Sequence, residues 1–218
     1  MSLFHDGTDD PVQLSAHHPV QGRAVLEELE LYWRDLRGAR RLPVRSDVDP
    51  AQIDAALPHA FILERVAPGV GRMRVAGSAL SGLLGMEARG MPLTTFFTPE
   101  ARLVVTGYLE RLFTEPALVE LPLYSARSIG RPRLTGRLLM LPLLGNDGTV
   151  SRALGAMFTD GMIGRAPRRF DIPSGGAMRC EPLPEPAVRM AAVSSARPHM
   201  QRRPDVVRPA LKLVVSNG

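Results

Sequence analysis

The sequence predicts an α+β domain: a five-stranded antiparallel sheet with helices on one face, preceded by an N-terminal amphipathic helix. In chain order, two short strand patterns come first, a helical crossing follows, and three more strand patterns come last. This order is typical of an antiparallel sheet covered by helices. The 218 residues, 44% of them hydrophobic, are enough to build one such core.

The N-terminal helix is predicted over residues 23–37. Leu26, Leu29, Trp33 and Leu36 recur at helical spacing and form one apolar face. This face has two interpretations, which the sequence leaves open. It packs on its own domain, or it pairs with a second chain, since aromatic anchors favour interfaces. We expect a homodimer through this helix.

Three more helices are predicted from their end signals. Asp49-Pro50 is a cap followed by proline at the first helical position, and it predicts a helix over residues 50–57. Ser78 begins a brief helix that Gly85 ends. Thr98-Pro99 begins the long crossing helix by the same logic as Asp49-Pro50.

The strands are predicted from alternation and turn signals. Pro122 lies within one of them and favours a place at the sheet edge. Asn146-Asp147-Gly148 predicts a tight hairpin turn between the last two strands. The five expected segments are residues 61–66, 72–76, 119–126, 134–144 and 152–159.

The charge divides the chain into regions. Residues 1–159 hold 17 Arg and 17 acidic residues, whereas residues 160–218 hold ten Lys and Arg against five acids and account for the whole net charge of +5. The second region also holds 8 of the 20 prolines. A proline-rich segment with few aromatics buries too little apolar surface to fold. We therefore expect a loose N-terminus over 1–20, the domain over 21–160, and a mostly disordered basic tail over 161–218.

Composition excludes several classes of protein. One cysteine, Cys180, permits no disulfide framework and no cysteine-based zinc site. No run of eighteen apolar residues predicts a membrane span, and the polar first ten residues are unlike a signal peptide. These features predict a cytoplasmic protein without a membrane partner. Sequence motifs of hydrolases, P-loop enzymes and zinc proteases are absent, so no catalytic residue is assigned.

Several segments share one family pattern: YWRDLRG (32–38), RLP (41–43), RSDVDP (45–50), LPH (57–59), RMRVAGS (72–78), GMEARG (85–90), residues 139–144 and LG (154–155). Over about residues 25–160, these segments resemble the PAS_5 family of alphaproteobacterial PAS-domain proteins. The resemblance implies a stand-alone sensory or regulatory PAS protein. Because catalytic motifs are absent, we expect that it is not an enzyme and that it acts on an unidentified signalling partner.

Two cofactors of other PAS domains need side chains that this sequence lacks at the expected positions. Flavin–thiol photochemistry needs a cysteine in the short-helix region, about residues 78–90, and none is there. Histidine-ligated haem needs an imidazole on the long helix, and residues 99–114 contain none. His59 is expected in a capping or surface role. We expect no cofactor and no metal site.

A pocket for an apolar small molecule is the second functional hypothesis. In a PAS domain the pocket lies between the sheet and the short helices, but the same residues would also simply fill a core, and the sequence does not distinguish the two. The candidate lining residues are Leu80, Leu83, Leu84, Phe96, Phe97, Tyr108 and Leu139.

The basic tail supplies a third hypothesis, an adaptor for nucleic acid or an acidic partner. The arginine pairs at 168–169 and 202–203 could bind phosphates. Their charge is dilute and aromatic stacking is absent, so nucleic acid is the weaker expectation. Signalling by protein–protein contact is the leading hypothesis.

Overall fold

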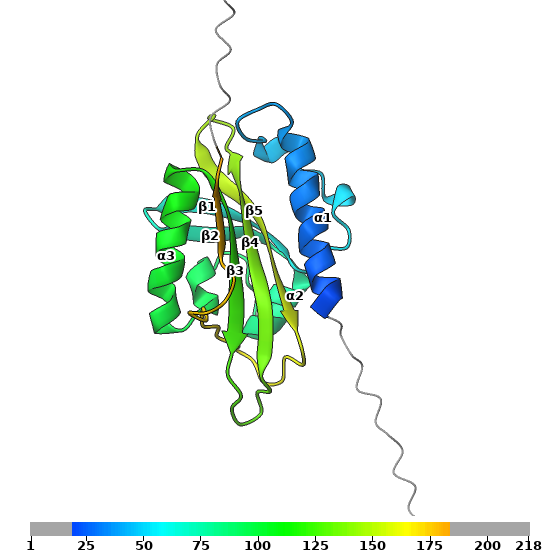
Figure 1. Cartoon of the computed structure of the whole chain (residues 1–218), viewed down its shortest axis with the longest axis vertical. Helices are drawn as coiled ribbons and strands as arrows, with labels where there is room; N and C mark the ends of the chain where they lie inside the picture. The colour runs from blue at the N-terminus through cyan, green and yellow to red at the C-terminus, as the bar shows by residue number, and fades with distance from the viewer. Residues whose placement is uncertain (1–18, 184–218) are drawn as a thin grey trace, which may run out of the picture. The chain divides into compact units, whose positions relative to one another are not determined.

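A computed structural model describes residues 19–183, which belong to one compact unit. Its six strands form one antiparallel sheet in the order β2-β1-β5-β4-β3-β6 (Figure 1). The α+β prediction is confirmed, with six strands in place of five. The elements are α1 (Pro19–Arg37), β1 (Ala60–Ala67), β2 (Val70–Ala76), α2 (Ser78–Leu84), α3 (Pro99–Thr114), β3 (Ala117–Ser125), β4 (Leu134–Leu144), β5 (Val150–Asp160) and β6 (Arg179–Pro182).

Local sequence explains most of the helix ends. Gly85 ends α2 in the left-handed conformation, with φ of 71°, which a glycine adopts without strain. Thr98 caps α3, its side chain accepting from the Ala101 amide. The helix predicted over 50–57 is wrong: a single 3-10 turn, Pro50–Gln52, is followed by turns. The chain leaves the helical path at Ile53, whose side chain is buried in the core.

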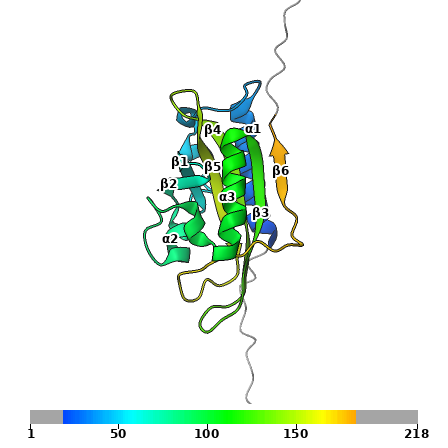
Figure 2. The same cartoon turned by 90° about the vertical axis from the view of Figure 1, so that its left-hand side faces the viewer.

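The two faces of the sheet carry separate cores. The inner face is covered by α2, α3 and the 3-10 helix Leu93–Phe96. The outer face is covered by α1 and the segment 42–57. Figures 1 and 2 show α1 and α3 on opposite sides of the sheet. Because β4 is buried on both faces, its alternate residues enter different cores: Leu138 and Met140 the inner, Leu139 and Leu141 the outer.

The sixth strand comes from the segment predicted to be a disordered tail. Residues Arg179–Pro182 pair with Ala117–Glu120 of β3, so Pro122 lies beyond the end of this pairing. The domain therefore continues to at least residue 183, and the boundary predicted at 160 is wrong. A short edge strand gains its stability from pairing with a neighbour that is distant in sequence, which local composition does not reveal. The predicted loose residues 1–18 and the predicted tail beyond 183 lie outside the described residues.

The segment just before β6 also enters the core. Phe170 is fully buried in the inner core, its amide donates to the Phe96 carbonyl at 2.8 Å, and the Thr98 amide donates to its carbonyl at 3.0 Å. Arg168 is fully buried too, and its amide donates to the Leu83 carbonyl at 2.7 Å. The hypothesis that the 168–169 pair binds phosphate is therefore wrong for Arg168, since its side chain is buried.

Candidate functional site

The predicted interior pocket is filled by the chain's own side chains. Each predicted residue from α2 and from the 93–97 segment is at most 4% exposed and packs in the inner core together with Phe170. Tyr108 is only partly buried, and its hydroxyl lies 3.7 Å from the Met178 sulfur. The α2 and 93–97 residues are Leu80, Leu83, Leu84, Phe96 and Phe97.

Leu139 lies on the opposite face of the sheet from the predicted pocket. Its side chain lies in the outer core beneath α1, because β4 alternates between two buried faces. The unbroken apolar run over residues 138–144 gives no signal for which residues face which core.

The predicted dimer face of α1 packs on its own sheet. Leu26, Leu29 and Trp33 are buried in the outer core, and Leu36 is partly buried against it. The Trp33 indole Nε1–H also donates to the Pro142 carbonyl at 3.0 Å. Of the two interpretations of this face, the structure shows packing on the chain's own sheet, and the homodimer stays a prediction. An amphipathic stripe predicts that a face is covered, but not by what.

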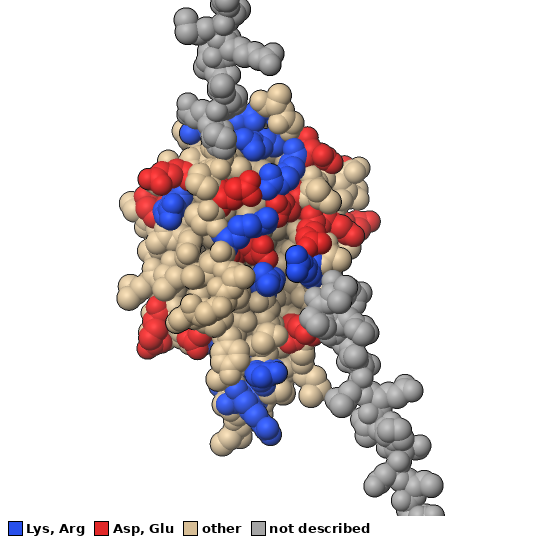
Figure 3. Space-filling model, in the orientation of Figure 1, with Lys and Arg blue, Asp and Glu red and all other residues tan. Residues whose placement is uncertain are grey.

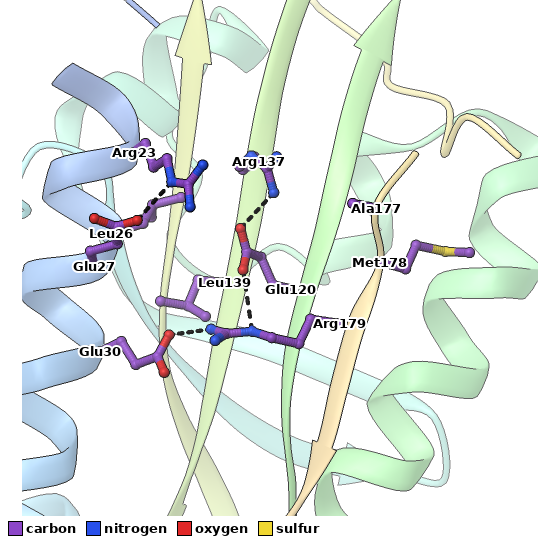
Figure 4. A pocket seen from close by; sticks show the side chains of 10 residues that line it. All are labelled: Arg23, Leu26, Glu27, Glu30, Glu120, Arg137, Leu139, Ala177, Met178 and Arg179. Carbon is purple, nitrogen blue, oxygen red and sulfur yellow. Dashed lines mark hydrogen bonds and ion pairs between the residues drawn. The ribbon is translucent and has the colours of Figure 1, made fainter. Parts of the chain in front are cut away.

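A groove runs between α1 and the outer face of the sheet, at the strands β3, β4, β5 and β6. It consists of two hollows, of about 320 and 460 Å³, that share Arg23, Leu26 and Arg137. We call this the α1 groove, and Figure 4 shows its first hollow. The remaining lining residues are Gly22, Glu27, Glu30, Glu120, Pro122, Leu123, Tyr124, Thr135, Gly136, Leu139, Phe158, Asp160, Pro173, Ala177, Met178 and Arg179.

Ion pairs cross the α1 groove from helix to sheet. Arg179 of β6 contacts both Glu30 of α1 and Glu120 of β3, the latter at 3.4 Å. Arg137 of β4 pairs with the same Glu120 at 2.7 Å (Figure 4). Arg34 joins Glu30 at 2.8 Å to Glu181 of β6 at 3.0 Å. The network therefore ties α1 to the edge strand through partly buried charges.

The other end of the groove is more apolar. Its apolar lining includes Leu26, Pro122 and Phe158, and its polar lining consists of Arg23, Tyr124, Thr135, Arg137 and Asp160. Helix α1 approaches the sheet closely here, because a Cβ added at Gly22 would lie 2.1 Å from the Phe158 ring. Helix α1 is thus held by apolar contacts along its face and by ion pairs at the β6 edge.

His59 lies beside this face, at the start of β1. Its ring packs at a tilt of 43° against Phe158, with 4.6 Å between centroids, and its Nδ1 is buried without a hydrogen-bond partner. Burial lowers the pKa of the imidazole, since the charged form is poorly solvated there. The expected capping or surface role is replaced by a half-buried packing role.

Residues 19–183 offer few candidate ligands for a metal or a cofactor. That part of the chain brings together no group of three His, Cys, Asp or Glu side chains that could hold a metal ion. Cys180 lies on β6 rather than in α2, and the interior where a flavin would lie is occupied by Leu83, Phe96 and Phe170. These residues do not fit a flavin, and the expectation of no cofactor stays a prediction.

Residues 22–158 match the family described as PAS_5, a PAS domain. The chain belongs to this family. Membership gives the PAS_5 protein a sensory or regulatory role, and it confirms the family resemblance seen in the sequence. No curated protein matches the chain.

Solved structures of light-oxygen-voltage domains are similar to this PAS_5 protein. One, studied with a flavin analogue, is 20% identical with a TM-score of 0.37, covering 52% of this chain and 87% of its own. The light state of the blue-light photoreceptor Aureochrome1 is 13% identical, with a TM-score of 0.36 and coverages of 52% and 89%. An RNA-binding light-oxygen-voltage receptor is 16% identical, with a TM-score of 0.36 and coverages of 53% and 35%.

Sequence reasoning missed the charged residues of the α1 groove. Two signals could have found some of them. Glu120 sits between Val119 and Leu121 in an alternating strand, which sends its carboxylate to the other face. Arg137 interrupts the most apolar strand of the domain. Arg179 gave no such signal, because β6 itself was not predicted.

Proposed function

We propose that this PAS_5 protein is a non-catalytic regulator that signals by protein–protein contact, with α1 as its movable element. The observation that carries the proposal is the contrast between a filled inner core and a partly charged groove under α1. A core filled by the chain's own side chains has little space for a ligand. A helix held partly by ion pairs, in contrast, can detach at a modest cost in free energy.

Detachment of α1 would expose a surface suited to a partner. Leu26, Leu29 and Trp33 form an apolar stripe that is buried only while α1 is docked. A released stripe with an aromatic anchor is a typical protein-binding helix. The expected homodimer then belongs to the released state, and its fraction should rise with every change that loosens α1.

The test measures detachment of α1 by hydrogen exchange of its amides and the dimer fraction by light scattering. In the full chain, Glu30→Gln removes the pairs to Arg34 and Arg179. The loss of partly buried pairs costs about 1 kcal/mol, or about a fivefold increase in the released fraction. Hydrogen exchange of the α1 amides should rise by that factor, and light scattering should show more dimer.

Glu28→Gln is the matched control, because Glu28 is exposed on the same helix and has no ion pair among the described residues. It should leave α1 exchange unchanged. If the α1 amides exchange only when the whole domain unfolds, in both wild type and Glu30→Gln, then α1 does not detach by itself. That result would contradict the proposal.

A second candidate function is a small-molecule sensor whose ligand lies in the α1 groove rather than in the interior. The apolar hollow of about 460 Å³ beside Phe158 favours it, since this volume suits a small apolar or amphipathic molecule. Native mass spectrometry of the full chain separates the two candidates. A co-purifying mass that is lost in Leu26→Glu supports the sensor, and its absence from several expression hosts favours the protein-contact regulator.

A further inference from the structure

Two loops meet at the end of the domain away from the β4–β5 turn. The β3–β4 loop, residues 126–133, lies beside residues 161–166, which follow β5. The Arg165 amide donates to the Gly130 carbonyl at 2.7 Å, and the Arg131 side chain donates to the Arg165 carbonyl at 3.1 Å. Figure 1 shows the β3–β4 loop projecting at the lower end of the sheet.

Four arginines surround this junction: Arg127, Arg131, Arg133 and Arg165. None of them pairs with a carboxylate among residues 19–183, whereas Arg34, Arg137, Arg152 and Arg179 all do. Figure 3 shows basic side chains gathered at this lower end. Unpaired like charges repel one another, so an anionic partner would relieve the repulsion.

Exposed apolar side chains lie among these arginines. Ile129, at the tip of the β3–β4 loop, is 97% exposed, and Met162 is 70% exposed. A single exposed apolar residue is ordinary. Here two of them share one projecting end with four unpaired cations. We call the six side chains the basic tip: Arg127, Ile129, Arg131, Arg133, Met162 and Arg165.

A buried arginine fixes the bases of both loops. The Arg168 guanidinium donates to the Ile163 and Pro132 carbonyls, both at 2.7 Å, and to the Ser125 hydroxyl at 3.0 Å. Burial lowers its pKa, and nearby Arg131 lowers it further. A buried cation held by oxygens from both loops keeps the basic tip in one shape, which limits the ordering needed on binding.

We propose that the basic tip docks on an anionic phospholipid surface, with Ile129 and Met162 inserted shallowly and the arginines on the headgroups. Apolar insertion and attraction between cations and anionic lipid are the two components of peripheral membrane binding. The described helices include none that is long and apolar enough to cross a bilayer, so the contact is a surface one. This proposal departs from the sequence-based expectation of no membrane partner.

A nucleic acid fits the basic tip less well. Single-stranded binding sites stack bases on aromatic side chains, and none of the six side chains is aromatic. An aliphatic residue at the apex has no role on a phosphate backbone, but it does in the boundary between headgroups and acyl chains.

The test is sedimentation of the full chain with vesicles. Wild type should bind vesicles of 70% phosphatidylcholine and 30% phosphatidylglycerol, but not pure phosphatidylcholine, and more weakly at high salt. The double variant Arg127→Gln/Arg133→Gln removes two exposed cations and should lower the partition coefficient roughly 10–30-fold, since each cation contributes about fivefold. Ile129→Asp should lower it roughly tenfold.

The controls are matched for chemistry and lie elsewhere, on α3. Leu103→Asp changes an apolar residue that is 79% exposed, and Arg111→Gln removes an exposed cation. Both should bind within twofold of wild type. Absence of vesicle binding, or equal binding by wild type and the double variant, would overturn the proposal. So would binding of a 20-nucleotide RNA that the double variant abolishes while Ile129→Asp leaves it intact, since the tip would then be a nucleic-acid surface.

Discussion

The two faces of the sheet are held to their helices by different forces. On the inner face, the aromatic side chains of Phe96, Phe97 and Phe170 pack with leucines from α2, and all are buried. On the outer face, α1 packs by Leu29 and Trp33 along one stripe and by charges along the other. In a close-packed core, the dispersion energy depends steeply on how well neighbouring side chains fit together. The strength of partly exposed ion pairs depends instead on salt and on competing charges.

This difference separates stability from regulation within one small domain. A change in the inner core should unfold the whole domain, because the sheet and α3 depend on it. A change on the outer face should first loosen α1 and leave the sheet folded. Three substitutions, at Phe170, Leu29 and His59, test this separation.

Phe170→Ala should give the largest effect. The substitution leaves a cavity beside Phe96 in the inner core and should cost about 3–5 kcal/mol. Chemical denaturation followed by circular dichroism measures this cost, and the transition should stay cooperative. A loss under 1 kcal/mol would mean that residues 163–172 are not part of the core.

Leu29→Ala should give an intermediate effect confined to α1. We expect a cost of roughly 2–3 kcal/mol, in the lower part of the range for this change, because a helix at the surface can shift to fill the gap. Trp33 emission should move to longer wavelength at a lower denaturant concentration than the loss of sheet signal. Coincident transitions would show that the two faces unfold as one unit.

His59 should give the smallest effect, through pH. Because burial lowers its pKa, the unfolded state binds a proton at a higher pH than the folded state does. This group's contribution to stability is therefore complete above an ordinary imidazole pKa of about 6.5 and declines as the pH falls below it. Denaturation between pH 8 and pH 5.5 should show a smaller decline in His59→Gln than in wild type. An equal decline in stability in His59→Gln and wild type would contradict the effect of burial on the pKa of His59.

Much of the fold follows from local sequence. The end of α2 at Gly85 and the start of α3 at Thr98-Pro99 were predicted, and so were both bounds of β4. These features depend on caps, on turns and on a long strand pattern, all of which neighbouring residues determine.

The misses share one physical cause, which is dependence on distant partners. β6 is four residues long and is defined by its pairing with β3. Leu139 points to the outer face by strand alternation, and it is a core residue there because α1 covers that face of β4. Arg168 lies in a segment rich in proline and charge, and its burial depends on carbonyl acceptors in two loops. No periodicity in the chain encodes these relations.

The burial of Phe170 also limits how far the domain can be truncated at its C-terminal end. The family match ends at residue 158, and a fragment ending there would lack both this ring and β6. Its inner core would open beside Phe97, and the β3 edge would lose its neighbour. Exposed apolar surface and an unpaired strand edge are the two features that promote aggregation. Expression of the isolated domain should therefore keep residues 19–183, and shorter fragments should be recovered mainly as insoluble protein.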